Sequence, residues 1–184
     1  HANTLYPHMF AWLDEVLEII RAHPETLFVL RAHPDESRPG KESRESVAEW
    51  VRARNAQALP NLHFVDAGAY FSSYELIQKS HFVMIYNSTI GLEAALLGAP
   101  VLSAGRARFT QLPTVYFPAS AEEYRRTLEE FLSGAVTAPP EFQRNARRFL
   151  YYQLFRTSLP FGEYIEEDGV WRGYVAFKAL HWQQ

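Results

Sequence analysis

Short apolar runs alternate along the chain with longer stretches in which apolar residues recur every three or four positions. The short runs are typical of strands buried on both faces, and they lie at residues 26–30, 62–65, 82–86, 101–103 and 114–117. The stretches with helical spacing lie within residues 1–24, 42–58, 72–79, 90–97, 120–132 and 141–155. Because the two kinds of element alternate every 20–30 residues or so, the pattern predicts an α/β fold: a doubly wound parallel sheet of about five strands with helices on both faces.

The stretch from residue 81 to 101 has the pattern of one strand–helix–strand unit. Its strand is followed at once by three residues that favour helix N-caps, namely Asn87, Ser88 and Thr89. Gly98 stands where a helix commonly ends, and Pro100 prevents its continuation. Glu93 is the one charged residue of this helix, and a carboxylate among apolar residues needs a partner. Open α/β sheets bind ligands at such strand-to-helix turns, where a helix N-terminus favours phosphate.

Three loops follow successive strands, at residues 31–41, 66–73 and 87–89, and a doubly wound sheet brings such loops to one edge. The first loop carries four side chains suited to an anion: Arg31, His33, Arg38 and Lys41. The third loop offers hydroxyl and amide groups at a helix N-terminus. Together these groups are suited to bind a phosphate or diphosphate, and Glu93 is suited to the hydroxyls of a ribose.

Each of these features also has a purely structural interpretation. His33-Pro34 is consistent with a turn that ends a strand. Ser88 and Thr89 are consistent with simple helix caps. Glu93 is consistent with pairing to a core arginine or a backbone amide, and the charges of the first loop with a solvated surface. The binding interpretation is favoured because independent features fall on the same edge of one sheet.

Composition narrows the possible functions. The 184 residues carry a net charge of −3, which argues against a general nucleic-acid binder. The chain has no cysteine, which excludes disulfides, thiolate catalysis and zinc held by cysteine. Since no histidine spacing matches a metal site, we expect no metal bound by the protein. No apolar window is long enough for a membrane span, and because the chain begins with His we expect a piece of a longer protein.

Four motifs carry a family resemblance: LRAHPDE at 30–36, NLHFVDA at 61–67, SSYELI at 72–77 and YNSTIGLEAALLGAPVL at 86–102. In this order they resemble the C-terminal half of GT-B glycosyltransferases, above all the capsule polysaccharide biosynthesis proteins that include bacterial Kdo transferases. Similar motifs occur in bacterial sialyltransferases and polysialyltransferases, and looser ones in CDP-glycerol glycerophosphotransferases. The resemblance covers residues 26–105 and fades after about residue 118.

This resemblance implies a Rossmann-like domain that binds a nucleotide-sugar donor, CMP- or CDP-linked, as the C-terminal domain of a GT-B fold. It implies a set of residues on the donor phosphate: His33, Ser88, Thr89, Arg31, Arg38 and Lys41. It implies a second set on the ribose and base: Glu93, Asn87, Ser73, Tyr74 and Glu75. No tightly bound cofactor is expected.

The same resemblance sets expectations for the chain's organisation and partners. Residues 1–134 are expected to form the donor-binding domain, with residues 135–184 as a helical and aromatic extension packed on it. Within the extension, Asp168-Gly169 is suited to a hairpin turn, although 174–182 is equally suited to a helix. The catalytic base is expected in an N-terminal GT-B domain that this chain lacks, so we expect the chain alone to be inactive.

The expected partners are the donor, a glycan or glycolipid acceptor and the missing domain, with no nucleic acid. The expected location is the cytoplasm, either free or peripheral at the inner face of the cell membrane. Two alternatives remain open at this point. One is a related enzyme, such as a glycerophosphotransferase or a sugar-nucleotide epimerase. The other is a non-catalytic GT-B-like module in polysaccharide assembly or export.

Overall fold

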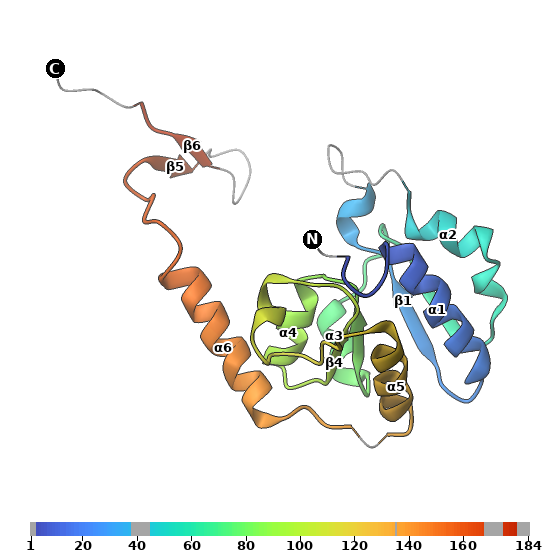
Figure 1. The fold of residues 1–184 in the computed structure, drawn as a ribbon. Helices are drawn as coiled ribbons and strands as arrows, with labels where there is room; N and C mark the ends of the chain where they lie inside the picture. The colour runs from blue at the N-terminus through green and yellow to red at the C-terminus, as the bar shows by residue number, and fades with distance from the viewer. Residues whose placement is uncertain (1–2, 38–44, 135, 168–174, 180–184) are drawn as a thin grey trace. The chain divides into compact units, whose positions relative to one another are not determined.

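The computed structural model describes residues 3–37, 45–134, 136–167 and 175–179 (Figure 1). The chain divides into two compact units, residues 1–146 and residues 147–184, and each is considered by itself. None of the described helices has the length and apolar content that a membrane crossing requires.

The first unit alternates helices and strands in the order that the hydrophobic pattern predicts (Figure 1). The elements are α1 Met9–Ala22, β1 Phe28–Arg31, η1 Pro34–Ser37, α2 Val47–Ala53, η2 Ala56–Ala58, β2 Leu62–Val65, α3 Ser73–Lys79, β3 Val83–Ile85, α4 Ile90–Leu96, β4 Val101–Ser103, η3 Arg108–Gln111, α5 Ala121–Leu132 and α6 Pro140–Phe155. The mixed α/β class is therefore confirmed.

The predicted continuous sheet of about five strands is not seen among the described residues. Strands β1 and β2 form one parallel pair, and β3 and β4 form another. The segment expected as a fifth strand makes a single parallel bridge, from Tyr116 to Leu102. Each strand has only three or four residues and so forms few ladder hydrogen bonds. The hydrophobic pattern indicates where strands lie and that they run parallel, but it does not show which strands pair.

Side-chain caps explain where the helices begin. Ser46 and Glu49 form a capping box at the start of α2, and Ser72 Oγ accepts from the backbone N–H of Glu75 at the start of α3. Helix α2 ends earlier than the sequence suggests, because Asn55 adopts a left-handed conformation with φ of 50°. The short 3-10 helix η2 follows this turn. It buries the side chain of Ala56 and leaves that of Ala58 exposed to solvent.

The core of the first unit joins α1 to α5. Helix α1 buries six large side chains: Trp12, Leu13, Val16, Leu17, Ile19 and Ile20. Trp12 Nε1 donates a hydrogen bond of 2.8 Å to the hydroxyl of the fully buried Tyr124. The ring of Tyr6 packs edge-on against Tyr124, with 5.8 Å between the ring centroids. This contact holds two helices together that lie far apart in sequence.

Asn61, at the start of β2, is one of the few buried polar residues. Its side-chain Nδ2 donates to the carbonyls of Ile20, His23 and Thr26, at 2.8, 2.9 and 3.3 Å. Its backbone carbonyl accepts from Phe28 at 2.8 Å. One residue therefore satisfies the C-terminal end of α1 and fixes the approach to β1.

The second unit begins within α6 and contains an antiparallel hairpin of β5 Ile165–Glu167 and β6 Val175–Phe177. Residues 175–177 thus form a strand and not part of a helix, while residues 174 and 180–182 lie outside the described residues. The expected turn at Asp168-Gly169 lies outside the described residues. That this unit packs on residues 1–134 stays a prediction.

Replacing Asn61 by Ala should lower the free energy of unfolding by about 2–3 kcal/mol, because three carbonyls lose a shared donor. Asn61→Asp keeps the size but offers only acceptors at neutral pH, so it should be at least as destabilising. Asn145→Ala is the matched control, since that amide makes one exposed bond to the Pro113 carbonyl. Urea unfolding at pH 7 checks this, and an Asn61→Asp variant as stable as wild type would contradict it.

Candidate functional site

The loops after β1 and β2 leave from the same end of their strand pair. Arg31 is in register with Val65, and the backbone N–H of Ala32 donates to the Val65 carbonyl at 3.0 Å. Across this edge the Arg31 guanidinium donates through Nη1 to the backbone carbonyl of Phe71. Arg31 Nε is buried and has no acceptor among the described residues. A buried donor of this kind is normally satisfied by water or a ligand atom.

His33 is exposed just beyond β1 and forms a local turn. Its Nδ1 accepts from the backbone N–H of Asp35 at 3.1 Å, and its carbonyl accepts from Glu36 at 3.0 Å. An accepting Nδ1 places the ring proton on Nε2, which is then available to donate to an anion. His33 therefore has a structural role in the turn through Nδ1, as the sequence suggested, while Nε2 remains available for binding.

Glu36, in the same loop, was not among the residues predicted from the sequence. Its half-buried carboxylate accepts from the backbone N–H of Val47 at 3.2 Å. Burial is the main cause that raises the pKa of Glu36, and the nearby charge of Asp66 acts in the same direction. The bond to Val47 and the charge of His33 lower this pKa, but they do not cancel the effect of burial. The sequence shows that two acidic residues, Asp35 and Glu36, follow His33-Pro34. It does not show that the carboxylate of Glu36 is half-buried.

The turn between β3 and α4 holds Asn87, Ser88 and Thr89, as predicted. Ser88 Oγ makes a long contact of 3.5 Å with the backbone N–H of Ile90. Thr89 is the N-cap residue, but its side chain makes no capping bond. The side chain of Asn87 is exposed. The simple capping interpretation is therefore weak for Thr89, and these side chains remain available to a ligand.

Helix α4 lies very close to β3, because Gly91 has no side chain. A Cβ at Gly91 would lie 2.3 Å from Cδ1 of Ile85. Leu92, Ala94 and Ala95 are buried with it, whereas Glu93 is only half-buried. The close packing of α4 on β3 therefore fixes the backbone from which Glu93 projects.

Glu93 pairs with Tyr74, which was neither of the partners that the sequence suggested. The hydroxyl of Tyr74, on α3, donates to Glu93 Oε2. This hydrogen bond and the negative charge of Glu93 raise the pKa of Tyr74. Within the described part of the chain, no hydrogen bond joins the side chains of Ser73 or Glu75 to this pair.

Two hydrogen bonds thus connect the first loop to the second, and the helices that follow the second and third loops to each other. Arg31 to Phe71 joins the first loop to the second, and Tyr74 to Glu93 joins the start of α3 to α4. Arg38 and Lys41 lie outside the described residues. The described residues contain no group of histidine and acidic side chains suited to a metal ion. The roles of the residues in binding stay predictions.

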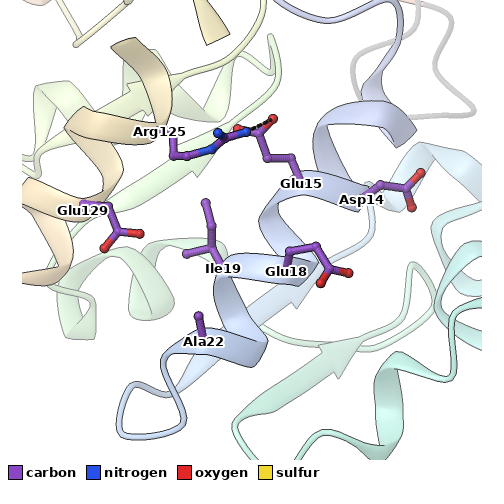
Figure 2. A pocket seen from close by; sticks show the side chains of 7 residues that line it. All are labelled: Asp14, Glu15, Glu18, Ile19, Ala22, Arg125 and Glu129. Carbon is purple, nitrogen blue, oxygen red and sulfur yellow. Dashed lines mark ion pairs between the residues drawn. The ribbon is translucent and has the colours of Figure 1, made fainter. Parts of the chain in front are cut away.

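A separate pocket of about 520 Å³ lies between α1 and α5. Its lining is mainly acidic: Asp14, Glu15, Glu18, Ile19, Ala22, Arg125 and Glu129. Figure 2 shows Arg125 reaching Glu15, and these side chains are 3.2 Å apart. The pocket is remote in sequence from the three loops, and its negative charge is unfavourable for a phosphate. We therefore do not assign the donor to it.

Glu36→Gln should stabilise the protein at pH 7, because Gln keeps an acceptor for Val47 without a charge to bury. Between 4.5, the usual value, and the raised pKa of Glu36, the native state binds more protons than the unfolded state. Its contribution to stability therefore falls as pH rises through that window. The advantage of Gln should grow with pH from 4.5 and vanish below it, as measured by urea unfolding at several pH values. An advantage independent of pH, or an equal one in the exposed control Glu45→Gln, would contradict this.

Comparison with known proteins identifies the family. The sequence profile of the capsule polysaccharide biosynthesis proteins matches residues 4–115, which is more than half of the chain and includes all three loops. No curated protein and no solved structure shows significant similarity to the chain. The resemblance carried by the sequence motifs is confirmed at the level of the family. The chain therefore belongs to the capsule polysaccharide biosynthesis protein family and has a role in making capsule polysaccharide.

Proposed function

We propose that this chain binds the nucleotide-sugar donor of a GT-B glycosyltransferase that acts in capsule polysaccharide biosynthesis. The donor is CMP- or CDP-linked, and residues 1–134 form the donor-binding domain. Family membership supports the pathway. The motif order from residue 30 to 102 supports the kind of enzyme.

The observation that carries this proposal is a pair of hydrogen bonds: one connects the first two loops, and the other connects the helices α3 and α4 that follow the second and third loops. A nucleotide-sugar presents phosphate, ribose and base at once, so its site needs polar groups from several loops held in fixed relation. The bond from Arg31 to Phe71 and the bond from Tyr74 to Glu93 supply that relation. The family match covers every residue of these two bonds.

In the proposed mechanism, the acceptor displaces the nucleotide at the anomeric carbon of the donor sugar. Negative charge then develops on the departing phosphate, and groups already aimed at it stabilise the transition state. His33 Nε2 and the Arg31 guanidinium would donate from the first loop, with Arg38 and Lys41 as further cations. Ser88 and Thr89 would donate from the turn before α4. The acceptor is a glycan or glycolipid, and a second GT-B domain would supply the base.

Calorimetric titration with CMP, CDP, UMP and UDP tests the proposal. Cytidine nucleotides should bind more tightly than uridine nucleotides. His33→Ala and Ser88→Ala should each weaken binding about tenfold, because each removes a hydrogen bond to a charged phosphate. The matched controls are His63→Ala, an exposed histidine on β2, and Ser133→Ala, at the end of α5; neither should change the affinity.

The outcomes separate the parts of the proposal. A uridine preference would overturn the cytidine donor and favour an epimerase-like relative. Binding that His33→Ala and Ser88→Ala leave unchanged would overturn the assigned site. Failure of every nucleotide to bind would overturn the donor-binding function of this chain and favour the non-catalytic module.

A further inference from the structure

The hydrogen bond between Tyr74 and Glu93 joins two partly exposed side chains, and each of them lies on a helix that is packed against the rest of the unit. Helix α4 is packed on β3 through Gly91 and three buried neighbours. Helix α3 is capped by Ser72 and buries Ile77. Just before α3, the Arg31 guanidinium holds the Phe71 carbonyl. The bond therefore restrains the torsions of the Glu93 side chain instead of following a mobile surface.

We propose that Tyr74 is a positioning residue: its hydroxyl orients the Glu93 carboxylate to accept from the ribose of the donor, which makes the site selective for ribonucleotides over 2′-deoxyribonucleotides. This inference rests on the proposed function, because it concerns which nucleotides the same donor site selects. The family resemblance implies Tyr74 as a residue on the ribose or base, whereas this inference gives it an indirect role, through the carboxylate of Glu93.

The chemistry of the pair suits this role. A carboxylate has two oxygens and accepts several hydrogen bonds, and Tyr74 occupies only Oε2. Within the described chain Tyr74 is the single hydrogen-bond partner of the Glu93 carboxylate, so Oε1 keeps its accepting capacity. The hydroxyl of Tyr74, like that of any ordinary tyrosine, is protonated at neutral pH and acts as a donor, and the hydrogen bond to Glu93 raises its pKa further.

Selectivity follows from the restraint on the carboxylate. When Glu93 is held toward the ligand, a nucleotide without the 2′-hydroxyl leaves a charged acceptor unpaired, which weakens binding. When Tyr74 is absent, the carboxylate is free to rotate into water. The two nucleotides should then bind almost equally.

A simpler role for Tyr74 is to fasten α3 to α4 without any effect on ligand choice. That role predicts that removing the hydroxyl lowers stability, or weakens all nucleotides by the same factor. The ratio of ribonucleotide to deoxyribonucleotide affinity separates the two roles, because a purely structural contact does not change this ratio.

The experiment measures dissociation constants of the 184-residue chain for CMP and 2′-deoxy-CMP. Wild type should prefer CMP by about tenfold, and Tyr74→Phe should reduce this preference to about twofold or less. Glu93→Gln should reduce the preference similarly, and the double variant should lose no more than either single one. Tyr70→Phe is the matched control, since Tyr70 is fully exposed in the preceding loop, and it should keep the wild-type ratio.

Melting temperatures of all variants, measured beside the titrations, show whether each is folded. A folded Tyr74→Phe variant that keeps the full CMP preference would overturn this inference and leave the proposed function standing. Equal binding of CMP and 2′-deoxy-CMP by wild type would do the same. Failure of wild type to bind any nucleotide would overturn the proposed function and this inference together.

Discussion

The side-chain amide of Asn61 is the contact on which the arrangement of the first unit depends. It donates to carbonyls at the end of α1 and in the turn before β1, while its own backbone leads into β2. Burying these carbonyls with fewer hydrogen bonds would cost free energy, so the amide stabilises the end of α1 against the strand pair. This junction adjoins the parallel pair of β1 and β2, in which Phe28 lies opposite Leu62 and the following loops leave from one edge.

The candidate site lies at this edge of the strand pair. Arg31 ends β1, and its guanidinium reaches a backbone carbonyl in the loop after β2 only because the two strands are parallel and in register. The helix that carries Glu93 depends in turn on a glycine for its close approach to β3, since a Cβ at Gly91 would meet the side chain of Ile85, which would have to shift. Positions that make no contact with a ligand thus decide where the polar groups lie.

The sequence predicts the positions of most helices and strands. It does not predict strand pairing or the partners of buried polar groups, and the reason is physical. Apolar runs and N-cap residues located the strands and helices of the first unit, because burial and capping are local properties. Strand pairing is not local, so the expected five-stranded sheet is replaced by two short pairs and a bridge. The need of Glu93 for a partner was evident, but the choice of Tyr74 was not, since the two residues meet only through tertiary packing. The burial of Glu36 was hidden for the same reason.

The hydrogen bond from Trp12 to Tyr124 closes a loop of 112 residues. During synthesis the first helix emerges long before α5, and its apolar face is covered completely only once α5 has left the ribosome. Contacts of such long sequence separation slow folding, since the chain must be closed before they form. The family match ends at residue 115. The piece that identifies the family therefore lacks the helix that completes the core.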